Sequence, residues 1–288
     1  MIYLQNILIK IGFGILGLIP TTILVRIFYR SLLLIGYRKQ VINNNYKSTI
    51  GKDLSKSTNL SFYKKCVLNI ARITVETLKL QYSKNEEINY GGIEELENKC
   101  LQNNGLLLLA SHYGNWELAC ILLAQHTSIP CYGVYKPLKN KVLDTKIKDL
   151  RSSYGLKLIP MNTIARVIAE NYNSGIPAIY ILISDQNPRS IQNVEWIDFL
   201  GIMTAFSKGP GKFVKKYKLP LAYMKIKPGK NVYNYDISFE LAEKVDADMT
   251  LKWYADQLAS QIKTAPEYWL WSHKRWKRKY KPLEHLEY

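Results

Sequence analysis

The pattern of apolar and polar residues changes near residue 105, where short apolar runs begin to alternate with longer amphipathic segments. Short apolar runs bounded by turn-forming residues are typical of buried strands, and apolar residues at three- and four-residue spacing are typical of helices. The runs predict strands at residues 106–110, 131–135, 156–160, 178–184 and 219–226, separated by helices at 116–124, 141–153, 163–172 and 206–217.

Strands and helices in alternation predict an α/β fold, with a mostly parallel mixed sheet flanked by helices. In such sheets, binding and catalytic groups collect beyond the carboxyl ends of the strands. Four polar residues follow predicted strands directly: His112, Lys136, Asp185 and Gln186. We therefore expect these residues to meet in one cleft.

The stretch GLLLLASHYGNWELA, residues 105–119, places a histidine between a strand and a helix. Asn115 is a good N-cap, so Glu117 falls in the first turn of the helix. Residues five apart on one helix lie about 140° apart around its axis, whereas a loop before the helix can bring Glu117 back to His112. A histidine held by a carboxylate is a general base with a fixed tautomer. The alternative is a loop histidine and a glutamate that complements the helix dipole, and the spacing alone does not choose between them.

The N-terminal region is apolar and is followed by basic residues. Residues 11–25 are uncharged and largely apolar, and Arg26, Arg30, Arg38 and Lys39 come next. Spanning a bilayer takes about 20 apolar residues, so this run lies between a single span and an interfacial helix. The positive-inside rule would keep the rest of the chain on the cytoplasmic side. A buried helix of a soluble protein is the other interpretation.

Composition indicates an anionic partner. The chain has 288 residues, with 40 Lys and Arg against 23 Asp and Glu, which gives a formal net charge of +17. Such a surplus suits nucleic acid, a phospholipid surface, or an acidic protein or substrate. Near the C-terminus, Trp269, Trp271 and Trp276 alternate with basic residues. This mixture suits single-stranded nucleic acid as well as anionic lipid headgroups.

The four cysteines and four histidines show no spacing typical of a metal site or a disulfide framework. A reducing cytoplasm is therefore the default environment.

Several ordered motifs resemble one known family. The string SHYGNWE at residues 111–117 resembles the His-x4-Asp/Glu block of the lysophospholipid acyltransferase superfamily, and specifically the lipid A late acyltransferase (lauroyl/myristoyl acyltransferase) family. The block from Tyr135 to Arg151, the Asp-Gln pair at 185–186 and the closing PEYWLWSHKRWK also resemble that family. The resemblance covers roughly residues 12–277. It departs at Lys136, where the family commonly has arginine, and at residues 48–51, where Phe-Pro is missing.

The resemblance implies a glycerol-3-phosphate-acyltransferase-like fold, with residues 1–35 as a membrane-anchoring helix and 36–288 as the acyltransferase domain. It implies transfer of an acyl chain from acyl carrier protein to a hydroxyl of a glycolipid, a lipid A precursor, at the cytoplasmic face of the inner membrane. Membrane lipid rather than nucleic acid is then the expected anionic partner, and no metal or organic cofactor is implied. The alternatives are an acyltransferase for a glycerophospholipid or aminolipid, and a non-catalytic protein that binds nucleic acid or lipid surfaces.

The resemblance also implies roles for individual residues. His112 would be the general base, oriented by Glu117, and backbone amides of the turn at residues 114–115 would bind the oxyanion. Arg151 would grip an acceptor phosphate with its bidentate fork, although it could equally be one solvated charge of a basic helix. The substrate-binding residues expected besides Arg151 are Lys136, Asp185, Gln186, Asn115 and Thr204. His273 would be a structural part of the closing motif.

Overall fold

A seven-stranded mixed sheet forms the centre of the protein. The computed structural model describes residues 17–51, 56–83, 86–135, 137, 140–188, 190–243 and 247–280. The strands lie in the order β1-β9-β8-β2-β5-β3-β4. They are β1 (Glu87–Gly91), β2 (Leu106–Ala110), β3 (Cys131–Tyr135), β4 (Lys157–Pro160), β5 (Ile179–Ile183), β8 (Leu221–Pro228) and β9 (Asn234–Leu241). Every pairing is parallel except that between β8 and β9, so the predicted mostly parallel mixed sheet is confirmed.

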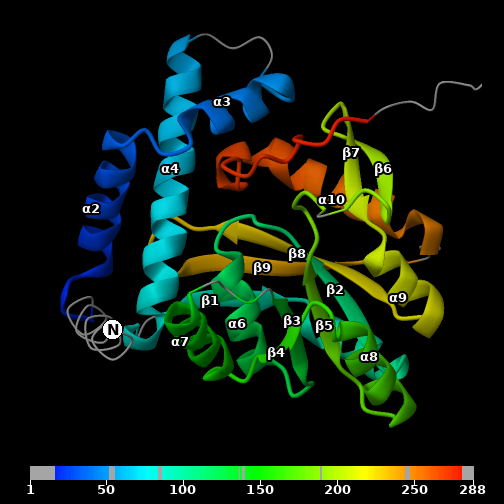
Figure 1. Cartoon of the computed structure of the whole chain (residues 1–288). Coiled ribbons are helices and arrows are strands. Elements are labelled where there is room, and N and C mark those ends of the chain that lie inside the picture. Colours follow the sequence, from blue (N-terminus) through cyan, green and yellow to red (C-terminus); the bar gives the residue numbers. More distant parts are fainter. Residues whose placement is uncertain are drawn as a thin grey trace, which may run out of the picture.

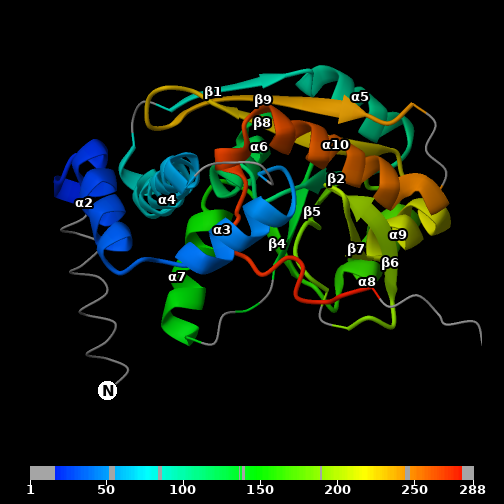
Figure 2. The ribbon, with the colours of Figure 1, turned by 90° about the horizontal axis from the view of Figure 1, so that it is seen from above.

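Helices flank this sheet, and a small hairpin stands apart from it. The helices are α2 (Thr21–Leu34), α3 (Lys39–Ser48), α4 (Lys56–Lys79), α5 (Ile93–Gln102), α6 (Trp116–His126), α7 (Lys141–Ser152), α8 (Ile164–Asn173), α9 (Gly209–Tyr217) and α10 (Thr250–Thr264). Short 3-10 turns are η1 (Leu80–Tyr82), η2 (Ala247–Met249) and η3 (Pro266–Tyr268), and the hairpin is β6 (Val194–Phe199) with β7 (Ile202–Ser207). In both ribbon views α4 lies between α2 and the rest of the molecule (Figures 1 and 2).

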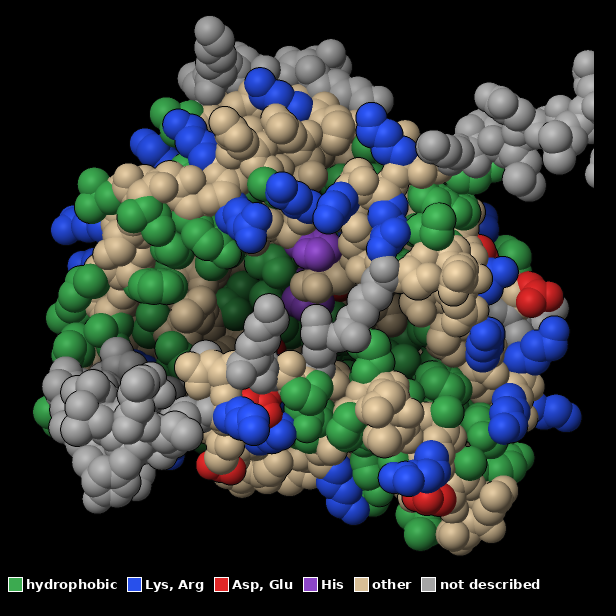
Figure 3. Space-filling view, viewed as in Figure 1, with side chains coloured by type: hydrophobic (Ala, Val, Ile, Leu, Met, Phe, Trp, Pro, Cys, Tyr) green, Lys and Arg blue, Asp and Glu red, His purple; other side chains and the backbone are tan. Residues whose placement is uncertain are grey.

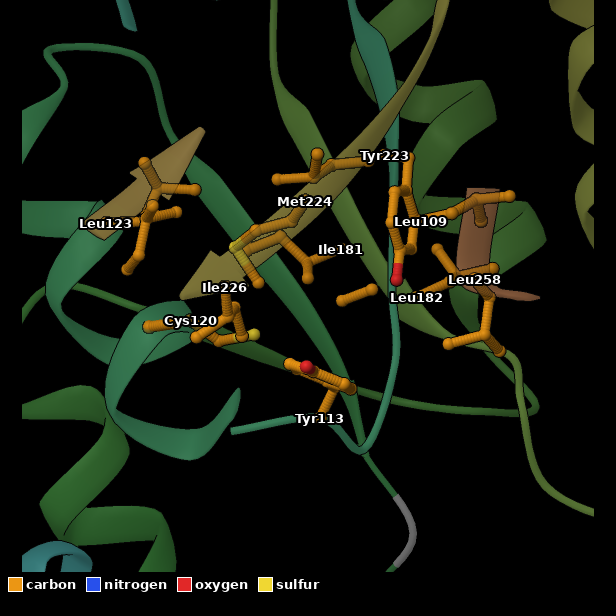
Figure 4. Packing of buried hydrophobic residues seen from close by; sticks show 14 of the residues in the cluster. Leu109, Tyr113, Cys120, Leu123, Ile181, Leu182, Tyr223, Met224, Ile226 and Leu258 are labelled. Atoms are coloured by element: carbon orange, nitrogen blue, oxygen red, sulfur yellow. The ribbon is translucent and has the colours of Figure 1, made fainter. Parts of the chain in front are cut away.

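The core is built around β2, which lies between β5 and β8. All five side chains of β2 are buried, because helices cover both faces of the sheet there. Figure 4 shows side chains of the central strands, such as Ile181 and Met224, gathered between Leu123 of α6 and Leu258 of α10. Continuous burial explains why this strand is a run of leucines rather than an alternating pattern.

The predicted helix at residues 206–217 begins later than expected. Residues 202–207 form β7, which pairs with β6 in an antiparallel hairpin, and α9 begins at Gly209. Leu200 and Gly201 between the strands both have positive φ, 56° and 80°. Two consecutive residues with positive φ match the tight turn whose twist suits a hairpin, so tertiary pairing replaces the first turn of the expected helix.

The predicted N-terminal anchor lies partly outside the described residues, which begin at residue 17. The described part, α2, packs on α4 through Leu24, Val25 and Leu32. Several apolar side chains on its other face and at its ends stay exposed, namely Leu18, Ile23, Ile27, Leu34 and Ile35. None of the helices in the described ranges has both the length and the apolar character needed to cross a bilayer.

Candidate active site

A histidine and an aspartate lie together at the carboxyl end of the sheet. His112 follows β2 and Asp185 follows β5, and these strands are parallel neighbours. The distance between His112 Nδ1 and Asp185 Oδ1 is 2.6 Å, and the backbone N–H of His112 donates to Asp185 Oδ2 at 2.9 Å. In a neutral imidazole the carboxylate favours the tautomer with the proton on Nδ1, in which Nε2 is a hydrogen-bond acceptor. This is the state that a general base requires.

Asp185 is buried and fully bonded. Its side chain is 2% exposed, and the indole N–H of Trp269 donates to Oδ2 at 2.8 Å. Burial acts to raise the pKa of Asp185, but the charge and hydrogen bonds of His112 and the bond from Trp269 outweigh it. The pKa lies below its usual value of 3.8, so Asp185 is ionised at neutral pH.

The other ring nitrogen of His112 faces the outside. Gln186 Nε2 donates to His112 Nε2 at 3.0 Å, and the Gln186 side chain is exposed. The ring of Trp116 meets the imidazole edge-on, with centroids 4.8 Å apart. Figure 3 shows histidine side chains at the bottom of a hollow, with Lys and Arg side chains along its upper rim and a hydrophobic area to the left. A hydroxyl group that displaced the Gln186 amide would reach Nε2 directly.

Glu117 does not hold His112. Its two carboxylate oxygens accept hydrogen bonds from Arg151, at 3.0 Å from Nε and 2.7 Å from Nη2, and no hydrogen bond joins Glu117 to His112 in the described structure. The carboxylate that orients His112 belongs to Asp185, which corrects the predicted pairing with Glu117. The first turn of α6 directs Glu117 toward α7, where Arg151 lies, whereas the sheet brings Asp185 beside His112.

Arg151 forms an ion pair with Glu117 and is not a solvated charge on the surface of its helix. Its side chain is 22% exposed and that of Glu117 is 23% exposed, so the pair is partly shielded from water. The bidentate pair joins α6 to α7. Within the described part of the chain, the hydrogen bonds of the guanidinium come from Nε and Nη2 and not from Nη1.

Asn115 has a structural position. It is 1% exposed, and its Oδ1 accepts from the N–H of Leu118 at 3.0 Å, which is the predicted N-cap of α6. Its Nδ2 donates to Glu76 Oε2 at 2.9 Å. Buried between α4 and α6, Asn115 does not reach the surface where substrate would bind, which corrects its expected role in substrate binding.

Glu76 links the turn after β2 to the rest of the fold through its bond with Asn115. Its carboxylate is completely buried and also accepts bonds from Arg72 Nε at 2.7 Å, the N–H of Tyr233 at 2.9 Å and Tyr235 Oη at 2.6 Å. A buried carboxylate needs such donors to remain charged.

A comparison with protein families identifies the family of this chain. The family model described as bacterial lipid A biosynthesis acyltransferase matches residues 2–278. The chain belongs to this acyltransferase family. Among curated relatives, a phosphatidylinositol mannoside acyltransferase from Mycolicibacterium smegmatis is 27% identical over 131 residues, which cover 44% of this chain and 41% of that protein. The chain thus matches less than half the length of this relative.

Three further residues that were predicted for the site of this lipid A acyltransferase family member are Thr204, Gly114 and Lys136. Thr204 is 1% exposed, donates to the carbonyl of Ile202 at 2.6 Å and accepts from Trp276 Nε1 at 2.8 Å, so it is structural rather than substrate-binding. The N–H of Gly114 donates to the carbonyl of Tyr268 at 3.0 Å and is not free for an oxyanion. Lys136 lies outside the described residues.

His273, in the closing motif PEYWLWSHKRWK, lies near the pair but does not join it. Its Nε2 accepts the N–H of Asn187 at 3.1 Å. Burial lowers the pKa of His273 below 6.5, and the nearby Asp185 carboxylate acts in the opposite direction. His273 is therefore neutral at pH 7 and uses its ring to hold the loop after Asp185.

The described His, Cys, Asp and Glu side chains offer neither a metal-binding cluster nor a reactive thiol. The described side chains of His, Cys, Asp and Glu nowhere gather in threes that could hold a metal ion. The cysteines Cys66, Cys100, Cys120 and Cys131 are buried and unpaired. Burial raises the pKa of each thiol, which makes them unreactive at neutral pH.

Proposed function

We propose that this protein transfers a fatty acyl chain from an acyl-carrier-protein thioester to a hydroxyl group of a lipid A precursor. Family membership supports the reaction class. The observation that carries the proposal is the His112–Asp185 pair, in which the buried carboxylate accepts a hydrogen bond from Nδ1–H and Nε2 faces the open side. An alcohol is a weak nucleophile at neutral pH and needs such a base.

The proposed reaction has two proton transfers, both through His112 Nε2. The acceptor hydroxyl takes the place of the Gln186 amide at His112 Nε2 and gives its proton to that nitrogen as its oxygen attacks the thioester carbonyl. Asp185 stabilises the imidazolium that forms. The tetrahedral intermediate collapses with cleavage of the carbon–sulfur bond, and the departing thiolate takes the proton back from His112. No covalent acyl-enzyme is needed.

Acceptor recognition is assigned to the basic groups around the site. Arg151 keeps Nη1 for a phosphate oxygen while Glu117 holds the rest of its guanidinium in place. Arginine suits this task because its planar fork matches phosphate. The relative from Mycolicibacterium smegmatis is named for a phosphatidylinositol mannoside, which also contains a phosphate, so that glycolipid is the second candidate acceptor.

We propose that the protein acts at the cytoplasmic face of the inner membrane. The outer face of α2 exposes Ile23 and Ile27 beside Arg26 and Arg30. Exposed apolar side chains flanked by basic residues suit a helix that lies in the interface of an anionic membrane. The surplus of positive charge also suits docking of an acidic carrier protein.

Mass spectrometry tests the function directly. Lipids from a strain that lacks the protein should be missing one acyl chain, and the mass difference identifies both acceptor and chain length. Purified protein with acyl carrier protein thioesters should restore that chain on the isolated lipid, and the His112→Gln variant should not. Unchanged lipids together with no transfer to either the lipid A precursor or phosphatidylinositol mannoside would exclude the proposed function.

A further inference from the structure

The second oxygen of Asp185 is held from a distant part of the chain. Trp269, which follows η3, donates its indole N–H to Asp185 Oδ2 at 2.8 Å. The bond is buried, because Trp269 is 3% exposed and Asp185 is 2% exposed. The only other donor to Oδ2 in the described structure is the backbone N–H of His112.

The same segment is also bonded to the histidine turn. The N–H of Leu270 donates to the carbonyl of His112 at 3.0 Å, and the N–H of Gly114 donates to the carbonyl of Tyr268 at 3.0 Å. Tyr113 and Trp269 form an antiparallel bridge. Residues 268–270 therefore hold both the base and the carboxylate that orients it.

Aromatic neighbours prevent the indole of Trp269 from turning away. Its ring centroid lies 4.8 Å from that of Trp271, 5.9 Å from that of Phe199 and 5.9 Å from that of Trp276. Edge-to-face contacts of this kind have a defined geometry. The N–H direction is thus set by the packing of the C-terminal segment against the β6–β7 hairpin.

We propose that Trp269 is a positioning residue for acyl transfer, whose indole N–H fixes the Asp185 carboxylate so that it presents Oδ1 to His112. This inference rests on the proposed function, in which His112 is the base. Without the indole N–H, the backbone N–H of His112 is the donor that remains to Oδ2 in the described structure, so the buried carboxylate is held less firmly in its orientation. Its charge is also less dispersed, so it holds the protonated imidazole more strongly.

Two kinetic consequences follow. Rotation of Asp185 lowers kcat, because His112 spends less time with Nε2 aimed at the hydroxyl. Stronger retention of the imidazolium moves the acid limb of the pH–rate profile to higher pH.

The other titratable groups near Asp185 are His273 and Arg275 of the C-terminal segment, Tyr223 of β8 and Tyr254 of α10. Burial lowers the pKa of Arg275 to about 10 and raises that of both tyrosines, so only His273 titrates near the same range.

Two neighbouring tryptophans provide matched controls. Trp271 Nε1 donates to the carbonyl of Pro266 at 2.6 Å, and Trp276 Nε1 donates to Thr204 Oγ1 at 2.8 Å. Trp271→Phe and Trp276→Phe therefore each remove one indole N–H that does not reach Asp185, and each keeps an aromatic ring against Trp269. Trp269→Phe should lower kcat by ~10–100-fold, the factor for one hydrogen bond to a charged group, and should move the acid limb upward. Both control variants should keep kcat within about twofold of wild type once corrected for the folded fraction.

A readout that needs no turnover separates this inference from the proposed function. With 15N-labelled histidine, the proton resonance of His112 Nδ1 should shift in Trp269→Phe and stay in place in both controls. If wild type transfers no acyl chain to any acceptor, the proposed function fails, whereas the resonance still tests the positioning role. A resonance and pH profile unchanged in Trp269→Phe, or equal losses of kcat in all three variants, would overturn the inference. Should Trp269→Phe not fold, benzothienylalanine at position 269 keeps the ring shape and lacks only the N–H.

Discussion

Glu117 and Arg151 form a bidentate ion pair between α6 and α7, although Glu117 is only five residues from His112. The pair therefore joins two helices, and the carboxylate beside the imidazole of His112 comes from Asp185. This division of roles leads to the first two predictions.

Asp185 should be more important for catalysis than Glu117. We expect His112→Gln and Asp185→Asn each to lower kcat by ~10²–10⁴-fold, because either change removes the oriented base. Glu117→Gln keeps the side-chain shape and should cost at least tenfold less than Asp185→Asn. Steady-state transfer rates of purified, folded variants measure the ranking. A larger loss in Glu117→Gln than in Asp185→Asn would restore Glu117 as the orienting residue.

Arg151→Lys separates acceptor binding from chemistry. Lysine keeps the positive charge but cannot hold Glu117 and a phosphate at the same time through a planar fork. We expect a raised KM for the acceptor and slower transfer, while slow hydrolysis of the thioester by water stays near the wild-type rate. His112→Gln is the control and should lose both reactions. Parallel loss of transfer and hydrolysis in Arg151→Lys would mean that Arg151 maintains the fold rather than the acceptor site.

Glu76 should be a large contributor to stability. Glu76→Ala leaves Arg72 and the donors from Asn115, Tyr233 and Tyr235 without their buried acceptor. Breaking a buried charge pair costs about 3–5 kcal/mol, which urea unfolding can measure. Glu240→Ala is the matched control, because its pair with Lys225 is exposed and should cost about 1 kcal/mol or less. A similar cost for both substitutions would contradict this role for Glu76.

The stability of the protein should fall as the pH drops below about 7. The folded pKa of His273 is lowered by burial, so the unfolded chain binds a proton at higher pH than the folded chain does. The stability linked to neutral His273 is therefore present above its unfolded pKa of about 6.5 and is lost as the pH falls through the folded value. The free energy of unfolding, measured by urea titration at several pH values, should show this slope. His273→Gln should flatten it in this range, and an unchanged slope would rule out His273 as the group responsible.

The exposed face of α2 should bind anionic membranes. Ile27→Glu places a charge among apolar side chains that face away from α4, so sedimentation with anionic vesicles should decrease while the melting temperature stays close to wild type. Lys47→Gln is a control for charge alone, because it changes the net charge by the same one unit at an exposed residue of α3. Equal binding by Ile27→Glu and wild type would show that another surface contacts the membrane.

The sequence by itself determined the central parallel strands, the helices between them and the place of His112. These features are local: the leucine run of β2 is apolar throughout because every side chain is buried, and Asn115 caps α6 with its own side chain. The positions of His112 and Asp185 after their strands were equally readable, because the carboxyl ends of parallel strands share one edge of a sheet.

Only the tertiary structure decided which groups touch at that edge. Asp185 lies 73 residues from His112 in sequence, yet strand order makes them neighbours, while helix geometry turns the nearer Glu117 toward Arg151. Asn115 and Thr204 belong to patterns typical of a site, but their hydrogen bonds are to buried partners. Trp269 reaches Asp185 because the C-terminal segment packs across the sheet edge. Apolar periodicity reports which side chains are buried, whereas the partner of a buried polar atom depends on distances between elements, which a linear pattern does not contain.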